Sequence, residues 1–355
     1  METQDQHIPM LELMLRPAFC VSNGRITKIN SAAAAYLLCQ GDEIAPLLST
    51  GAAEYETFGD GCLYLTLSLG SRSIGATVIA TKEHHLFVLD APSEQAELQS
   101  LALAAKELRE PLNAMLASAE QMLPGSESDD KLLAQFNRRM YQTLRIVSNM
   151  SDAALFSQVD NSRQECCEIC SFFRELLDKT VLQLQQAGLR LSYSLPNQPI
   201  YALVDSHQLE RALYNLISNA AKHSSFGDSI QVDISLRGRR LAICVTDHGP
   251  GIDPAVKGSI YSRFLRTPSL ADAQEGLGLG MMLVRSAATA HGGTVLIDHP
   301  QGCGTRVTMT IGLQQVSSQI RTPILRIDYA GERDHGLQEL ADVLPAHLYS
   351  KQNID

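Results

Sequence analysis

The chain has 355 residues, a formal net charge of −10 at pH 7 and a sequence pI near 5.5. This length is enough for two or three domains, each with a core of its own. The acidic balance excludes a protein that binds the phosphate backbone of nucleic acid, because such a protein needs a basic surface stripe. No apolar run reaches the roughly 18 to 20 residues that cross a bilayer, and the first residues lack the pattern of a signal peptide, so we expect a cytoplasmic protein with no membrane span.

Residues 1–92 predict a small mixed α/β domain. The stretch AFCVSNGRITKIN places an Asn23-Gly24 turn between two alternating strands, and an Ala-rich helix is predicted from Ser31 to Leu38. The runs LYLTLSLG and ATVIATKEHHLFVLD then alternate as antiparallel strands do. This order of elements resembles a PAS sensor domain, and the resemblance implies a sensory role for a signal that the sequence does not identify.

The apolar period changes at residue 93, where residues follow alternating steps of three and four that predict one face of a long helix. This first stripe comprises Leu98, Leu101, Ala105, Leu108, Leu112, Met115, Ala119 and Met122. After the breaker PGSESDD at residues 124–130, a second stripe comprises Leu133, Phe136, Met140, Thr143, Val147, Met150 and Ala154. Residues 93–160 therefore predict an antiparallel helical hairpin, whose wide apolar face favours a homodimeric four-helix bundle. The alternative is a hairpin that packs on the other domains of its own chain.

Residues 161–315 alternate between predicted helices at 172–188, 206–223 and 281–291 and predicted strands at 189–195, 231–238, 240–247, 294–300 and 306–313. Helices on one face of a mixed sheet make an α+β sandwich. The cluster of Cys166, Cys167 and Cys170 is interpreted as small apolar side chains leading into a strand and a helix, with a soft-metal site as the alternative. Residues 316–355 form an extension of unknown role, with a strand-like ILRIDY and a helix-like DHGLQELADVL.

Three short segments within residues 161–315 carry groups suited to a nucleotide. On the predicted helix at 206–223, Asn215 and Asn219 point the same way and Lys222 lies one turn further on, which offers amide oxygens for Mg²⁺ and an ammonium for phosphate. Asp247 follows a strand and begins the run DHGPGID, where its carboxylate can accept a hydrogen bond from an amine such as that of adenine. The run GLGLGM at residues 276–281 leads into a helix, whose bare N-terminal amides suit phosphate oxygens.

In order and spacing, these segments resemble the catalytic ATP-binding domain of sensor histidine kinases. The family's N box matches ERALYNLISNAAKHS, its two glycine boxes match DHGPGID and GLGLGM, and its F box matches residues 260–264 between them. The resemblance covers roughly residues 165–313. It implies that the preceding hairpin is the family's dimerisation and phosphoacceptor domain.

The resemblance also implies a role for each matching residue. Asn219 would hold Mg²⁺, Asn215 would flank the metal and the γ-phosphate, Lys222 would contact phosphate, and Asp247 would take the adenine amine. The rest of the ATP-binding set, which shapes the nucleotide lid, comprises Gly249, Gly251, Gly276, Gly278, Leu279 and Gly280. Leu277 stands where the family has Thr or Ser, and losing one hydrogen bond costs about 0.5 to 1.5 kcal/mol, so Mg-ATP binding is expected to survive.

The run KELREPL, which begins at Lys106, resembles the family's phosphoacceptor motif His-Glu-Leu-Arg-Thr-Pro-Leu. Lys106 stands at the acceptor position and Glu107 at the position of the general base. A neutral imidazole has a lone pair, whereas an ammonium has none, so Lys106 is not expected to be phosphorylated. Glu110 stands where the family uses Thr or Asn to orient water for dephosphorylation, and its carboxylate would repel the phosphate.

These features predict a histidine-kinase-like signalling protein that binds Mg-ATP, does not autophosphorylate and controls a partner such as a response regulator or another kinase. Two alternatives remain open. One is an active kinase that phosphorylates a histidine in trans on a partner. The other is a GHKL-type ATPase in which hydrolysis drives a conformational cycle.

Overall fold

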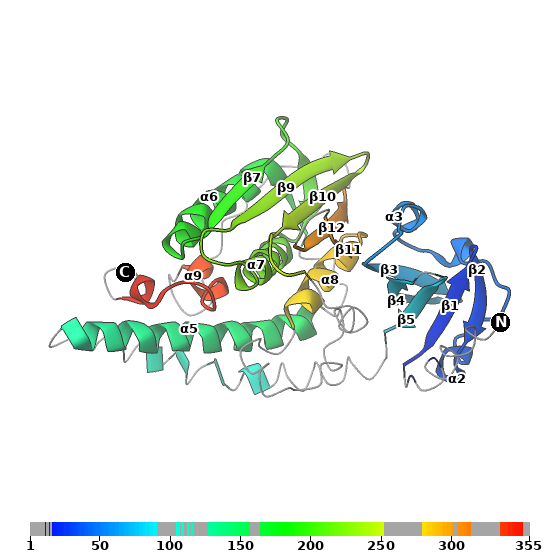
Figure 1. Ribbon diagram of the computed structural model, residues 1–355, viewed down its shortest axis with the longest axis horizontal. Coiled ribbons are helices and arrows are strands. Elements are labelled where there is room, and N and C mark those ends of the chain that lie inside the picture. Colours follow the sequence, from blue (N-terminus) through cyan, green and yellow to red (C-terminus); the bar gives the residue numbers. More distant parts are fainter. Residues whose placement is uncertain are drawn as a thin grey trace.

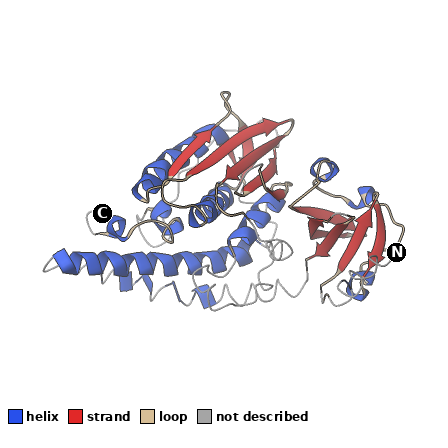
Figure 2. Cartoon of the chain, viewed as in Figure 1, coloured by secondary structure: helices blue, strands red, loops and turns tan. Residues whose placement is uncertain are grey.

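The computed structural model describes residues 11, 14, 16–81, 83–90, 127–156, 164–251, 279–300, 304–313 and 334–350, together with the helical positions 104–106, 108–109, 112–113, 115–116 and 119. These residues form an N-terminal α/β region and a larger α/β region, and the larger region lies along one long helix (Figure 1, Figure 2). Among the described residues, no helix has both the length and the apolar character that crossing a bilayer requires.

The N-terminal region is a five-stranded antiparallel sheet with the order β2-β1-β5-β4-β3. Its elements are β1 (Ala18–Ser22), β2 (Arg25–Ile29), α2 (Ser31–Ala34), η1 (Ala45–Leu47), α3 (Ala52–Glu56), β3 (Cys62–Leu69), β4 (Arg72–Ala80) and β5 (His85–Leu89). Asn23 and Gly24 have φ angles of 50° and 73°, which confirms the predicted turn. The helix predicted from Ser31 to Leu38 was wrong in length: it ends at Ala34, and Leu37 adopts a left-handed φ of 60°.

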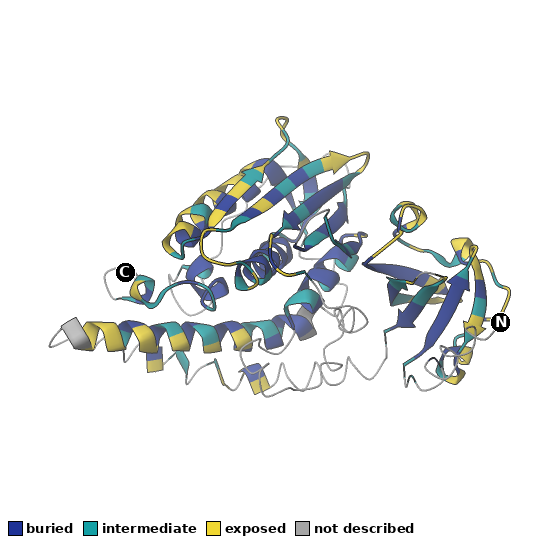
Figure 3. Ribbon diagram, in the orientation of Figure 1, coloured by how far each residue is buried: buried dark blue, intermediate teal, exposed yellow. Residues whose placement is uncertain are grey.

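The second helix of the predicted hairpin is α5 (Glu127–Phe156). It begins inside the segment that was predicted to be a breaker, because acidic residues such as Asp129 and Asp130 are favourable at a helix N-terminus. The predicted stripe is also partly wrong. Phe136 and Thr143 are exposed, whereas Tyr141 and Leu144 are buried. The reason is that residues 334–350, near the C-terminus, pack on a different face of α5 from the predicted one (Figure 3).

The described positions of the first hairpin helix also divide into two kinds. Ala105 and Ala119 are buried, while Leu108 and Met115 are about half exposed. Three residues of the first stripe, Leu98, Leu101 and Met122, lie outside the described residues.

The larger region contains a mixed sheet of order β11-β12-β10-β9-β7, in which β7 runs parallel to β9 and the other pairs are antiparallel. Its strands are β7 (Arg190–Ser194), β9 (Ser229–Arg237), β10 (Arg240–Thr246), β11 (Val295–Asp298) and β12 (Arg306–Gly312). The helices α6 (Ile169–Gln186), α7 (Ser206–Lys222) and α8 (Gly280–Ala290) share one apolar core with this sheet. The predicted layers are therefore confirmed.

A second sheet of two strands, β6 (Glu165–Glu168) and β8 (Tyr201–Val204), joins this region. The cysteine cluster lies in β6 and at the start of α6, and Cys166, Cys167 and Cys170 are all buried. The Cys170 thiol donates to the carbonyl of Gln198 at 3.4 Å. These contacts fit the interpretation of the cysteines as small buried side chains.

The two α/β regions share a continuous sheet of ten strands, because β3 pairs antiparallel with β11. Two ion pairs flank this junction: Arg285 lies 3.1 Å from Asp90, and Arg240 lies 3.1 Å from Glu54. The sequence gives no sign of this junction. The alternation of apolar and polar residues in β3 and β11 shows that each is a strand, but it does not indicate which other strand each one pairs with.

The C-terminal segment, residues 334–350, contains α9 (His335–Glu339) and η5 (Ala346–Tyr349). The helix predicted through DHGLQELADVL is shorter than expected, because the chain turns after Glu339 and buries Leu340 and Leu344 separately in the core of the larger region. Tyr349 stacks edge-on against Tyr141 of α5, with ring centroids 5.2 Å apart. The predicted strand ILRIDY lies outside the described residues.

Candidate nucleotide site

Helix α7 positions the three residues of the first predicted segment. Asp205 caps the helix by accepting a hydrogen bond from the Gln208 amide at 3.1 Å. Asn215 is buried, and its Nδ2 donates to the Arg211 carbonyl at 2.8 Å. Asn219 and Lys222 are partly buried near the C-terminal end of the helix. The amide oxygens and the ammonium thus lie along one helix, as the spacing predicted.

Asp247 lies just after β10, and its carboxylate is held by the backbone. Its Oδ1 accepts hydrogen bonds from the amides of Gly249 at 2.9 Å and Thr305 at 3.0 Å. Gly304 packs so closely that a Cβ there would lie 1.9 Å from the Asp247 carbonyl oxygen. Since the side chain is buried, these contacts fix a single orientation of the carboxylate.

Two glycines bring the three segments together. A Cβ on Gly249 would lie 2.4 Å from the carbonyl oxygen of His223, which follows α7. A Cβ on Gly280, the first residue of α8, would lie 2.8 Å from Oδ1 of Asn215. The end of β10 therefore meets the chain just after α7, and the start of α8 meets the middle of α7, so a side chain at either glycine would push these elements apart.

Some predicted site residues lie outside the described residues, namely Glu107, Gly276 and Gly278. Of the others, Gly251 has a left-handed φ of 81°, and Leu279 is buried. Lys106 is exposed on the first hairpin helix. Its neighbour Ala105 belongs to an apolar cluster with residues of α5 and with Leu279, Met282 and Leu283 at the start of α8.

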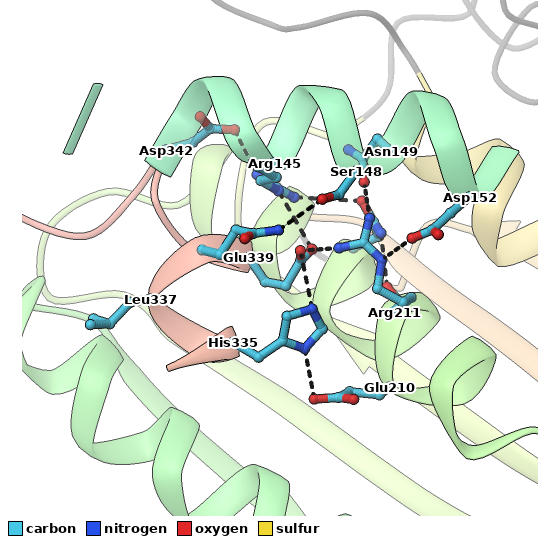
Figure 4. A network of polar contacts seen from close by, with 12 residues as sticks. Arg145, Ser148, Asn149, Asp152, Glu210, Arg211, His335, Leu337, Glu339 and Asp342 are labelled. Atoms are coloured by element: carbon cyan, nitrogen blue, oxygen red, sulfur yellow. Dashed lines mark hydrogen bonds and ion pairs between the residues drawn. The ribbon is translucent and has the colours of Figure 1, made fainter. Parts of the chain in front are cut away.

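Sequence reasoning missed a set of charged residues from α5 and the C-terminal segment that reaches this site (Figure 4). Oδ2 of Asp342 lies 2.5 Å from Nζ of Lys222 and 2.6 Å from Nη1 of Arg145. Nη2 of Arg145 in turn lies 3.5 Å from Oδ1 of Asn215. Burial alone would raise the pKa of Asp342, but the charges of Arg145 and Lys222 lower it overall, so the carboxylate is ionised.

A second part of the network lies deeper in the protein. Arg211 is fully buried and forms ion pairs with Glu339, which is also fully buried, and with Asp152 of α5 at 2.8 Å. Burial favours the protonated form of Glu339, but Arg211, His335 and Arg145 together hold its pKa below the ordinary value. The C-terminal segment is therefore joined to α7 and to α5 through charges that water does not screen.

His335 begins α9 and lies between two carboxylates. Its Nδ1 is 2.9 Å from Oε1 of Glu210, and its Nε2 is 3.7 Å from Oε1 of Glu339. Burial would lower the pKa of His335, but the hydrogen bond and charge of Glu210, with the charge of Glu339, raise it overall against the opposing charge of Arg211. The neighbouring His207 on α7 has a pKa of about 4, because it is buried and lies near Arg211 and His335.

Comparison with known proteins identifies the larger region. Residues 204–315 match the family described as Histidine kinase-, DNA gyrase B-, and HSP90-like ATPase. This region is a histidine kinase-like ATPase domain. The matched residues contain the three segments that α7, the end of β10 and the start of α8 bring together.

Two relatives with curated names extend the match toward the hairpin. Sensor protein KdpD of Escherichia coli is 28% identical over 243 residues, which are 64% of this chain and 26% of that protein. Sensor histidine kinase WalK of Bacillus subtilis is 26% identical over 226 residues, which are 61% of this chain and 37% of that protein. These matches support a histidine kinase family and two-component signal transduction. The chain matches well under half of the length of either relative.

A solved structure agrees with the fold of the histidine kinase-like ATPase domain. The crystal structure of full-length ShkA in complex with AMPPNP superimposes with a TM-score of 0.50 at 21% identity, and the match covers 62% of this chain and 47% of that chain. At this identity the likeness concerns the fold alone.

Proposed function

We propose that this chain is a histidine-kinase-like signalling protein that binds Mg-ATP at the site described above but does not autophosphorylate. The single observation that carries the nucleotide proposal is the close packing of two glycine segments along α7. Gly280 meets Asn215, and Gly249, whose amide binds the Asp247 carboxylate, meets His223. Two of these contacts exclude even a methyl group, as expected where the backbone closes around a ligand.

The residues present fit Mg-ATP chemically. In this proposal the amide oxygen of Asn219 ligates Mg²⁺, and the ammonium of Lys222 neutralises phosphate. Two backbone amides hold Oδ1 of Asp247, and Oδ2 accepts the adenine amine. The start of α8 presents backbone amides to phosphate oxygens. Bound Mg-ATP supplies a transferable γ-phosphoryl group, while the protein side chains orient it and balance its charge.

Lys106 is the reason that we propose a degenerate kinase. Its side chain is exposed, and Ala105 beside it shares an apolar cluster with the start of α8, which supports a position addressed by the ATP-binding domain. An ammonium has no lone pair to attack phosphorus, so Glu107 at the base position has no nucleophile to activate. The chain therefore signals through nucleotide-dependent conformation rather than through a phosphohistidine.

The domain boundaries form part of the proposal. Residues 1–92 are a PAS-like sensor domain, 93–160 a dimerisation hairpin, 161–315 the ATP-binding domain and 316–355 an extension. The antiparallel order of the N-terminal strands supports the first assignment. Exposed apolar residues on α5 support a homodimeric four-helix bundle, namely Leu132, Phe136 and Ile146. We place the protein in the cytoplasm, with a response regulator or a partner kinase as its target.

The test uses the full chain and γ-labelled ATP with Mg²⁺. We expect no base-stable label on the wild type, and label on Lys106→His, because the substitution restores a nucleophilic ring nitrogen. Asp247→Asn in the Lys106→His background serves as the control and should remove the label. Base-stable label on the wild type would overturn the degenerate assignment. Transfer of label to a histidine of an added partner would favour the trans-kinase alternative, and steady phosphate release without any labelling would favour the ATPase.

A further inference from the structure

The C-terminal segment, residues 334–350, lies above α5 in Figure 1, below α6 and beside α7, and it contacts all three helices. Arg138 of α5 donates to the carbonyls of Ala341 at 3.2 Å and Asp342 at 3.0 Å. Asn137 donates to the carbonyl of Tyr349 at 3.0 Å. These bonds from α5 side chains to backbone carbonyls hold the segment in a fixed position over the end of α7.

The position of Asp342 in this segment brings a carboxylate to the phosphate side of the candidate site. Its Oδ2 contacts Lys222 at 2.5 Å, and it also contacts Arg145 at 2.6 Å, as Figure 4 shows. Lys222 is the cation assigned to phosphate, and Asp342 is thus in the place of an anionic ligand of that ammonium.

Arg145 adds a second contact at the same site. Its guanidinium lies 3.5 Å from Oδ1 of Asn215, the oxygen assigned to the metal and γ-phosphate region. A guanidinium at this distance repels a divalent cation, while the Asp342 carboxylate repels a polyphosphate. Arg145 also attracts phosphate and Asp342 attracts Mg²⁺, so the pair opposes Mg-ATP chiefly because Asp342 already holds the Lys222 ammonium.

We propose that residues 334–350 act as an intramolecular brake on the nucleotide site, with Asp342 competing with nucleotide phosphate for Lys222. The inference rests on the proposed function, since it assumes that this site takes Mg-ATP. Nucleotide entry requires Asp342 and Arg145 to leave the N box. Because the same segment is bound to both α7 and α5, its release also removes one of the links between the ATP-binding domain and the long helix, beside the direct Arg211–Asp152 pair and the apolar contacts of α8 with α5. Nucleotide loading is thereby coupled to the arrangement of the hairpin.

Coupling of this kind is reciprocal. If the docked segment lowers nucleotide affinity by a given factor, bound nucleotide lowers the stability of the docked segment by the same factor. This gives a readout in the wild-type chain that needs no substitution. Hydrogen exchange of the amides in residues 334–350 should become faster on addition of Mg²⁺ and the analogue AMP-PNP.

The direct test compares the full wild-type chain with Asp342→Asn by titration with AMP-PNP in Mg²⁺ buffer. The substitution keeps the side-chain shape and removes the charge that competes with phosphate. We expect Asp342→Asn to bind about tenfold more tightly, within the 5- to 150-fold range typical of coupled sites. Asp130→Asn, an exposed acidic residue at the start of α5, is the matched control and should leave the affinity unchanged.

The outcomes separate the brake from the proposed function. Tighter binding by Asp342→Asn together with faster exchange in the wild type supports the brake. Binding that is equal within twofold, with unchanged exchange of residues 334–350, overturns the brake and leaves the nucleotide function standing. If neither chain binds AMP-PNP although Asp342→Asn unfolds at the same thermal midpoint as the wild type, the proposed nucleotide function is wrong, and the brake is wrong with it.

Discussion

The most demanding prediction concerns the buried arginine of α7. Substitution of Arg211 by Met leaves two buried carboxylates, Glu339 and Asp152, without the cation that lies between them. Removing one partner of a buried ion pair costs about 3 to 5 kcal/mol. Glu339 keeps Arg145 and His335 as neighbours at 3.7 Å, so we expect this variant at the lower end, about 3 kcal/mol. Glu339→Gln, in contrast, leaves Arg211 paired with Asp152, so the cost is that of one charge-assisted bond, about 1.5 to 3 kcal/mol.

Native-state hydrogen exchange of α7 and residues 334–350 measures these costs as the free energy of local opening. The matched control is Arg139→Met on α5, because Arg139 is exposed and bonds to Gln142 within the same helix. This control should change the opening free energy by no more than about 0.5 kcal/mol. The reasoning is refuted if Arg211→Met differs from the control by less than about 1 kcal/mol, or if Glu339→Gln proves the more damaging variant.

Three further predictions concern the β3–β11 junction, the nucleotide site and His335. Gly61→Ala should loosen the β3–β11 junction, because its Cβ would lie 2.1 Å from a carbonyl oxygen of β11. The control is Gly70→Ala, which has a similarly left-handed φ but meets nothing within 4 Å, so it should only strain a turn. Faster amide exchange in β11 of the Gly61 variant alone would confirm the prediction. Gly249→Ala should weaken AMP-PNP binding at least tenfold in a titration, because the added methyl group collides with the chain after α7; unchanged affinity would contradict the assigned site. The pKa of His335 is raised above its ordinary value of about 6.5, so the protonated ring stabilises the docked C-terminal segment. This stabilisation is complete below about pH 6.5 and is lost as the pH rises through the raised pKa. After correction for the intrinsic exchange rate, amide hydrogen exchange of residues 334–350 should therefore accelerate with rising pH more in the wild type than in His335→Gln. Equal pH profiles of exchange in the two proteins would exclude this role of His335.

Local signals in the sequence were enough to predict most elements. Asn23-Gly24 predicted its turn because both residues tolerate left-handed φ angles. A helix was predicted over 206–223, and the spacing of Asn215, Asn219 and Lys222 placed all three along it, which α7 matches. The resemblance to the ATP-binding domain of sensor histidine kinases implied that the glycine segments and Asp247 belong to one site. The close approach of Gly280 to Asn215 agrees with that prediction.

The failures concern contacts between distant parts of the chain. The apolar pattern of α5 gave one stripe, but Tyr141 and Leu144 are buried by a segment about 200 residues away, which no periodicity within the helix can indicate. Asp342 is one acidic residue among many in the sequence, and its role depends on Lys222 and Arg145 lying beside it. Long-range ion pairs of this kind have no local signature.

The continuous ten-stranded sheet has a practical consequence for work with fragments. Where β3 meets β11, each strand covers the outer edge of the other region's sheet. Cutting the chain between them would leave two rows of unpaired backbone donors and acceptors, which are templates for association with other chains. The ATP-binding domain expressed without residues 1–92 should therefore self-associate, and adding the N-terminal domain back as a separate chain should restore its solubility.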